Sequence, residues 1–159
     1  MTQSAQASNN DAILRYVTFR LEEEVYGINV MQVQEVLRVT EIAPVPGAPD
    51  YVLGIINLRG NVVTVVDTRE RLGLGAKEME ESTRIVIIEA DKMVVGILVD
   101  AVAEVVDLRT SEIESPPSVG NDESSKYIQG VATREGELLI LVDLNKLLNN
   151  EEWAELGSM

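Results

Sequence analysis

The stretch "YVLGIINLRGNVVTVVDTRERL" (residues 51–72) occurs a second time in the chain as "YIQGVATREGELLILVDLNKLL" (residues 127–148). The two copies align without a gap, and both place a glycine between two apolar runs of strand length. A short connection with glycine between two such runs predicts a β-hairpin. We expect Gly60 and Gly136 to supply the positive φ angle that each turn requires.

The sequence upstream of each hairpin is duplicated as well. "YGINVMQVQEVLRV" (26–39) aligns with "VGILVDAVAEVVDL" (95–108), again without a gap. Shared glycine, tyrosine and aspartate positions over ungapped blocks indicate an internal duplication rather than a chance likeness between apolar strands. Aliphatic residues recur at every third position in both blocks. This spacing predicts a strand interrupted by one tight helical turn.

Each half contains about five short β-rich segments in roughly 60 residues, which is typical of a small barrel. We therefore predict an all-β protein with two tandem, pseudo-repeated five-stranded barrels packed together, short helical segments and a C-terminal helix. Whether strands at the chain ends cross between the barrels stays open. The predicted boundaries are a disordered tail (1–15), a first barrel half (16–82), a second barrel half (83–150) and a helix end with tail (151–159).

The composition excludes several classes of function. The chain of 159 residues has 13 basic and 27 acidic residues, giving a net charge of −14. Such a chain is poorly suited to nucleic acid or anionic membrane surfaces, which attract Lys and Arg. Cysteine and histidine are absent, which removes thiolate chemistry and the commonest general base and metal ligand. We expect no enzyme activity, no cofactor and no metal site.

The sequence also gives an expectation for the location of the protein. The N-terminus "MTQSAQASNNDA" is polar and lacks the basic and apolar regions of a signal peptide. No apolar run reaches the roughly 18 residues that a transmembrane helix needs. We therefore expect a cytoplasmic protein with no direct membrane insertion.

Four acidic residues recur in the repeat and are the candidates for chemistry. Asp67 and Asp143 follow an apolar run in both copies, and a pair of carboxylates is conceivable as a hydrolytic site. We favour the interpretation that each caps a short helical segment, because aspartate is a preferred N-cap residue. For Glu35 and Glu104, surface structure and partner contact remain equal alternatives. Three aromatic residues are expected to pack in the core: Tyr51, Tyr127 and Trp153.

Arg59 interrupts the apolar run of the first hairpin and aligns with Glu135 in the second. The turn is therefore duplicated, while the charge is not. No acidic residue stands beside Arg59 in the sequence. Arg59 is either a solvated turn residue or a positive charge presented to a partner, and we favour the second interpretation.

The duplicated strings, above all "NLRG" followed by "VVD", resemble the CheW family of bacterial chemotaxis coupling proteins. The resemblance extends over about residues 16–150. It implies Src-homology-3-like barrels, no catalysis, and an adaptor or scaffold that couples membrane chemoreceptors to the chemotaxis histidine kinase. The alternative is an adaptor of the same fold in another chemosensory array, such as one that controls type IV pili.

The resemblance also implies partners and contact residues. The kinase regulatory domain has a similar double barrel, so the two proteins dock barrel to barrel and can form rings at membrane-associated arrays. The helical cytoplasmic tip of the receptor lies in a groove between the barrels, and an acidic receptor residue would pair with Arg59. The receptor-facing residues implied are Val33, Glu35, Gly54, Arg59, Gly96, Val102 and Val105, with the two glycines expected to keep the groove open. The implied kinase contacts are Ile42 and Val45.

Overall fold

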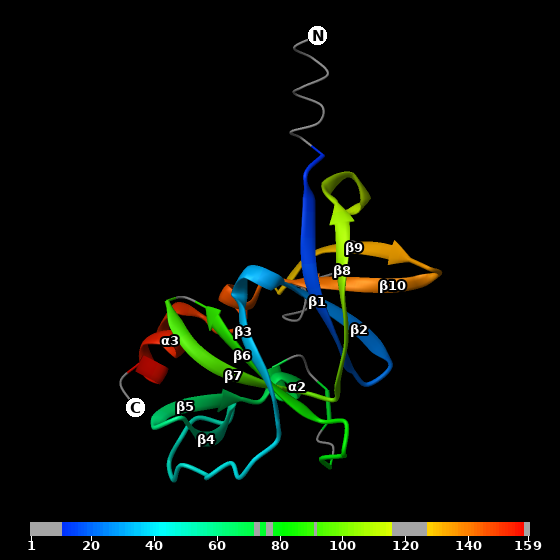
Figure 1. Cartoon of the computed structure of the whole chain (residues 1–159). Helices are drawn as coiled ribbons and strands as arrows, with labels where there is room; N and C mark the ends of the chain where they lie inside the picture. Colours follow the sequence, from blue (N-terminus) through cyan, green and yellow to red (C-terminus); the bar gives the residue numbers. More distant parts are fainter. Residues whose placement is uncertain (1–10, 72–73, 76–77, 91, 116–126, 158–159) are drawn as a thin grey trace.

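A computed structural model describes the chain over residues 11–71, 74–75, 78–90, 92–115 and 127–157. It consists of strands joined by short connections, with few helical segments (Figure 1). The strands are β1 (Ile13–Leu21), β2 (Glu24–Asn29), β3 (Val33–Arg38), β4 (Val52–Leu58), β5 (Asn61–Val66), β6 (Arg84–Ala90), β7 (Met93–Val99), β8 (Ala101–Arg109), β9 (Ile128–Arg134) and β10 (Glu137–Val142). The helical segments are η1 (Val30–Gln32), α2 (Thr68–Arg71), η2 (Thr110–Glu112), η4 (Leu144–Lys146) and α3 (Asn150–Gly157).

The strands form two five-stranded sheets in the orders β8-β1-β2-β10-β9 and β3-β6-β7-β5-β4. We call the first the terminal barrel, because it contains the first and the last strand (β1 and β10), and the second the central barrel. If the second repeat is numbered like the first, the two orders are identical. Each barrel takes its first two strands from one repeat and its last three from the other. The all-β prediction with two five-stranded barrels is therefore confirmed.

The sheets divide the chain differently from the predicted boundaries at 16–82 and 83–150. The chain passes from the terminal to the central barrel between β2 and β3, and returns between β7 and β8. The repeat could not reveal this exchange, because equivalent strands align equally well whether they pair within a copy or between copies. At the N-terminus, β1 begins at Ile13, inside the segment predicted as a tail.

The predicted helical turn within the strand is present in the first repeat only. Asn29 accepts a hydrogen bond from the Met31 amide at 2.9 Å, and this bond caps η1 between β2 and β3. In the second repeat Asp100 alone separates β7 from β8. Aspartate and asparagine occupy the two crossings because both favour hydrogen bonds to nearby backbone amides.

Both repeats carry a β-bulge at the same place. The β3–β6 register shifts between Val33 and Glu35, and the β8–β1 register shifts where Val102 and Val105 face Phe19 and Val17. A bulge bends its strand and re-aims a side chain. The recurring glutamates, Glu35 and Glu104, both lie at these bulges.

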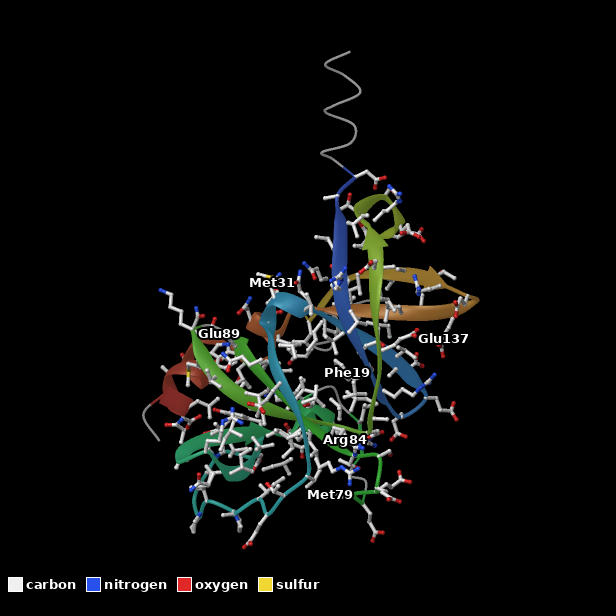
Figure 2. The ribbon with its side chains drawn as sticks, in the orientation of Figure 1. Phe19, Met31, Met79, Arg84, Glu89 and Glu137 are labelled. Carbon is white, nitrogen blue, oxygen red and sulfur yellow. The ribbon has the colours of Figure 1, made fainter. Side chains whose placement is uncertain are left out.

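Three clusters of buried residues make up the core. One lies within each barrel, and the largest lies between them, where Phe19, Tyr26, Ile97, Trp153 and other apolar side chains meet. Figure 2 labels Phe19 in the region where the two sheets meet. Since each barrel has only a small core of its own, burial between the barrels contributes much of the stability of the fold.

The recurring aspartates are helix caps, as predicted. The Asp67 carboxylate accepts from the Glu70 amide at 3.2 Å, and the Asp143 carboxylate accepts from the Asn145 amide at 3.0 Å. After Asp143 the chain forms two helical segments, η4 and α3. Asn149 and Glu152 form a reciprocal capping box at the start of α3. This cap separates α3 from η4.

Two arginines of α2 tie the central barrel to other parts of the molecule. Arg69 is 6% exposed and forms ion pairs with Asp100 and with Glu22 of the β1–β2 turn. Arg71 donates two bonds of 3.1 Å to Glu152 of α3. These bonds fix the barrels and the C-terminal helix relative to one another, because buried charged groups require their partners.

The recurring tyrosines and the tryptophan pack as predicted, and each makes a polar bond. The Tyr51 hydroxyl donates to Glu155 at 2.7 Å, and burial followed by this bond raises the pKa of Tyr51. Arg71 donates to the Tyr127 hydroxyl at 3.3 Å, and the Trp153 indole donates to the Asn145 carbonyl at 3.0 Å. In the described ranges, no helix has the length and apolar composition to cross a bilayer.

Candidate partner-binding surface

β3 and β8 are equivalent strands, and each carries a pair of valines close to the crossing between the barrels. Val33 and Val102 are half-buried against the core between the barrels. Val36 and Val105 are 40% and 54% exposed. The structure therefore places Val33 and Val102 against the core between the barrels and leaves Val105 exposed on β8. Val36 is exposed at the equivalent position of β3 and was not among the predicted site residues. Its alignment with Val105 was the signal that could have identified it.

Met31 extends this apolar surface at its most exposed point. It lies in η1, immediately before β3, and is 87% exposed (Figure 2). Methionine is flexible and polarizable, so it suits a surface that packs against a partner. An unbranched apolar side chain this exposed contributes nothing to the core of its own protein.

Glu35 and Arg59, both predicted to contact the receptor, contact each other. Arg59 Nη1 lies 3.2 Å from Glu35 Oε1, and Nη2 donates a second bond to Oε2. Arg59 therefore has an acidic partner within the chain, although none stands beside it in the sequence. The partner is 24 residues away in the sequence. The curvature of the central barrel brings the β3 bulge to the tip of the β4–β5 hairpin.

The pair shifts the acid–base equilibria of both side chains. The hydrogen bond from Arg59 lowers the pKa of Glu35, and the same bond raises the pKa of Arg59. Both groups therefore stay charged at neutral pH. The Arg59 side chain is 69% exposed and the Glu35 side chain 30%. Arginine has five N–H donors, so most of this guanidinium remains accessible to a partner.

The turn that carries Arg59 is a two-residue hairpin turn with positive φ at both positions. Arg59 has φ 51° and Gly60 has φ 87°, between the paired residues Leu58 and Asn61. The prediction for Gly60 and Gly136 is confirmed, since Gly136 has φ 79°. Asn or Gly is the favoured first residue of such a turn. Arginine at this position is therefore not the choice that the backbone alone would favour.

The two predicted glycines act inside the central barrel. A Cβ atom on Gly54 would lie 2.4 Å from the Ala43 carbonyl oxygen, where Ala43 and Ile55 form the bridge that closes the barrel. A Cβ atom on Gly96 would lie 2.9 Å from Ile85 Cγ2 in the barrel core. A side chain at either position would meet the protein itself before it met a partner.

The predicted kinase contacts lie on the long connection between β3 and β4. Ile42 is half-buried against the core of the central barrel, and the Val45 carbonyl accepts a bond of 3.1 Å from the Ala48 amide. Beside them, Ala43, Ile55, Ile56 and other residues line a shallow hollow with Val62 at its rim. Val62 is 68% exposed, and the repeat aligns it with the exposed Leu138.

Comparisons with known proteins agree with the duplicated barrels. The model of the CheW-like domain matches residues 15–152. The chain is 35% identical to "Chemotaxis protein CheW" of Rhizobium meliloti (strain 1021) over 152 residues, 96% of this chain and 97% of the relative. It is 33% identical to "Chemotaxis protein CheW" of Treponema pallidum (strain Nichols) over 154 residues, 94% of this chain and 91% of the relative.

A solved structure has the same fold. The crystal structure of scaffolding protein TtCheW from Thermoanaerobacter tengcongensis matches with a TM-score of 0.81 and 34% sequence identity, over 89% of this chain and 97% of that one. Likeness of this extent in both sequence and structure covers both barrels and the crossings between them. The protein belongs to the CheW-like domain family.

Proposed function

We propose that this protein is a non-catalytic adaptor that couples membrane chemoreceptors to the chemotaxis histidine kinase. Its membership of the CheW-like family supports this proposal, together with the Glu35–Arg59 pair that a strained turn presents on the surface. The role requires two separate binding surfaces on one rigid body. The ion pairs and apolar core between the barrels provide that rigidity.

The receptor surface of this proposal lies along β3, β8 and the tip of the β4–β5 hairpin. A receptor helix would place apolar side chains against Val33, Val36, Val102 and Val105, in the manner of helix-in-groove recognition. The exposed part of the Arg59 guanidinium would bind an acidic or carbonyl group on the helix and fix its register. Gly54 and Gly96 then serve this surface indirectly, by shaping the barrel beneath it.

The kinase surface of this proposal lies on the central barrel, at Ile42, Val45 and the hollow beside Val62. An exposed valine at the rim of an apolar hollow is suited to docking against a similar barrel. Such barrel-to-barrel contacts can repeat into rings, in which the protein also meets copies of itself. The proposed location is the cytoplasm, at membrane-associated receptor arrays, without membrane insertion, nucleic acid or cofactor.

Binding experiments with each partner test the proposal. A receptor-tip fragment and the kinase regulatory domain are each titrated with the protein, and both are expected to bind. Val105→Glu should weaken receptor binding alone, and Val62→Glu should weaken kinase binding alone. Val94→Glu, at a 40% exposed valine on β7, is the matched control and should change neither. A folded protein that binds neither partner would overturn the proposal.

A further inference from the structure

The terminal barrel has the same two backbone positions as the Glu35–Arg59 site, a strand bulge and a hairpin turn, but the residues there carry different charges. Glu104 lies at the β8 bulge where Glu35 lies at the β3 bulge. Glu135 occupies the hairpin position of Arg59 and has the same left-handed backbone, with φ 53°. The same two positions that hold a carboxylate and a guanidinium in the central barrel therefore hold two carboxylates in the terminal barrel.

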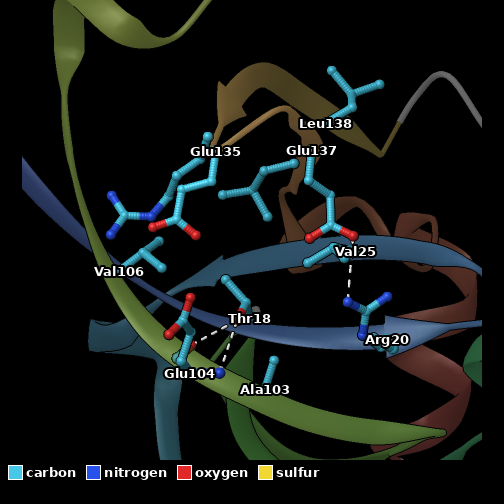
Figure 3. Close-up of a pocket in the computed structure, with 11 residues that line it drawn as sticks. Thr18, Arg20, Val25, Ala103, Glu104, Val106, Glu135, Glu137 and Leu138 are labelled. Atoms are coloured by element: carbon cyan, nitrogen blue, oxygen red, sulfur yellow. Dashed lines mark hydrogen bonds and ion pairs between the residues drawn. The ribbon is translucent and has the colours of Figure 1, made fainter.

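Glu104 and Glu135 line a pocket on the terminal barrel, and Figure 3 shows their carboxylates pointing toward one another from opposite sides. Within the described part of the chain, neither carboxylate has a side-chain partner. Arg20, which also lines the pocket, pairs with Glu137 at 3.3 Å. Arg134 donates to the Asp107 carbonyl at 3.5 Å. Arg134 lines the pocket as well, and in the described residues neither arginine is paired with Glu104 or Glu135.

The pocket has a fixed wall and an apolar lining. The Thr18 side chain is buried within the β8 bulge, where its hydroxyl accepts from the Glu104 amide at 3.0 Å and donates to the Glu104 carbonyl at 2.7 Å. These bonds hold the Glu104 backbone in place. Val25 and Val106 are buried at 7% and 3% exposure and line the same pocket. A ligand here would meet a carboxylate on a fixed backbone and an aliphatic surface together.

We propose that this pocket binds an arginine side chain of a protein partner, with its guanidinium between Glu104 and Glu135 and its methylene groups against Val106. Planar two-bonded pairing with carboxylates favours a guanidinium over an ammonium ion. The central barrel already contains such a pair at the equivalent positions. A net charge of −14 favours a basic partner over a second copy of this chain.

This inference does not rest on the proposed function. It concerns the tip of the β9–β10 hairpin and the bulge of β8, where Glu104 lies between Val102 and Val105 of the proposed receptor surface. It adds a contact site beside the β8 valines. The two backbone positions of this site recur in both copies of the repeat, and the pair of carboxylates is specific to the second copy.

Titration with N-acetyl-arginine methylamide, followed by amide NMR shifts, tests the site directly. We expect saturable shifts at Thr18, Glu104 and Gly136, and no saturation with the uncharged citrulline analogue. The double variant Glu104→Gln/Glu135→Gln should bind about tenfold more weakly, as expected from lost hydrogen bonds to charged groups. Glu151→Gln, at an exposed glutamate of α3, is the matched control. Equal binding by the double variant, or shifts spread over all acidic surfaces, would overturn the proposal.

In a second experiment, a substitution at position 135 supplies the guanidinium from within the chain. Glu135→Arg should place a guanidinium in the pocket from within, as Arg59 does beside Glu35, and thereby abolish binding of the probe. Adding Glu104→Gln should remove any gain in thermal stability that Glu135→Arg brings. If Glu135→Arg does not fold, Glu135→Gln alone should still weaken the probe severalfold. Undiminished probe binding by a folded variant at position 135 would contradict the assignment.

Discussion

Glu35 and Arg59 form a two-bonded ion pair that joins the bulge of β3 to the tip of the β4–β5 hairpin. Both residues lie on the surface implied for receptor binding, and the pair fixes the position of the guanidinium there. Most of the Arg59 side chain nevertheless remains exposed. The pair is therefore a positioned charge on the surface and not a buried structural bond.

Arg59→Asn should separate stability from binding. Asparagine adopts positive φ more readily than arginine and precedes Gly60, so the turn should become more favourable. We expect the gain in the turn to offset the loss of the exposed ion pair with Glu35, so the midpoint of thermal unfolding should change little while receptor binding weakens. As a control, Gly60→Ala should destabilise the protein by about 1 kcal/mol, because a Cβ is disfavoured at positive φ. A strong loss of stability in Arg59→Asn would mean that the arginine serves the fold.

The pKa of Glu35 should respond to Arg59. The folded-state pKa is lowered by the Arg59 hydrogen bond, so the pair stabilises the fold above the unfolded-state pKa of Glu35. That contribution is lost as the pH falls through the lowered folded-state pKa. Carboxyl NMR titration should give a higher pKa for Glu35 in Arg59→Asn than in the wild type. The pKa of Asp107, lowered by Arg15, should stay unchanged and serves as the internal control.

Gly54→Ala and Gly96→Ala should destabilise the central barrel. The added methyl group would lie 2.4 Å from the Ala43 carbonyl oxygen in the first variant and 2.9 Å from Ile85 Cγ2 in the second. Overpacking of this kind costs about 1–3 kcal/mol, and the contact with rigid backbone should make Gly54→Ala the more severe. Denaturant unfolding measures both effects. Gly75→Ala, which has open space, should leave stability nearly unchanged, and equal stability in all three variants would refute the packing argument.

Asp67→Ala and Asp143→Ala should each lower the free energy of unfolding by about 1 kcal/mol, the usual cost of losing an N-cap. Their carboxylates accept from the amides of Glu70 and Asn145. Asp→Asn at either position keeps an N-cap acceptor and should retain most of the stability. If Asp→Asn destabilised the protein as much as Asp→Ala, these side chains would be doing something other than capping.

The sequence predicted the strands, turns and caps better than it predicted which strands pair in each barrel. Hairpins, turn glycines and aspartate caps depend on a few neighbouring residues, so local patterns reveal them. The exchange of strands between repeats leaves no such pattern, because Gly27 pairs with Leu141 and Gly96 with Val65 in equivalent registers. The segment between the two matching blocks of the second copy, which contains two prolines, falls largely on residues 116–126, and these lie outside the described residues.

The same holds for the candidate surface, where single residues could be predicted and contacts between distant residues could not. Val33, Val102, Val105 and Arg59 could be identified from the resemblance, but the Glu35–Arg59 contact could not, since barrel curvature creates it. The sequence also did not predict which apolar side chains are exposed. Val62 lies in an apolar run of strand length, yet it is 68% exposed. Because the chain is duplicated, each position can also be compared with its equivalent in the other copy, and this comparison is a further signal for surface residues.

The affinity of a receptor-tip fragment for three proteins tests the central claim most directly: wild type, Arg59→Glu, and the exchanged pair Glu35→Arg/Arg59→Glu. Arg59→Glu sets two carboxylates together, as at Glu104 and Glu135, on an exposed turn that contributes little to the core. We predict that Arg59→Glu binds at least about tenfold more weakly, with its melting temperature little changed. The exchanged pair should restore the internal bond without restoring binding. Wild-type affinity in folded Arg59→Glu would contradict the claim that this guanidinium contacts the receptor.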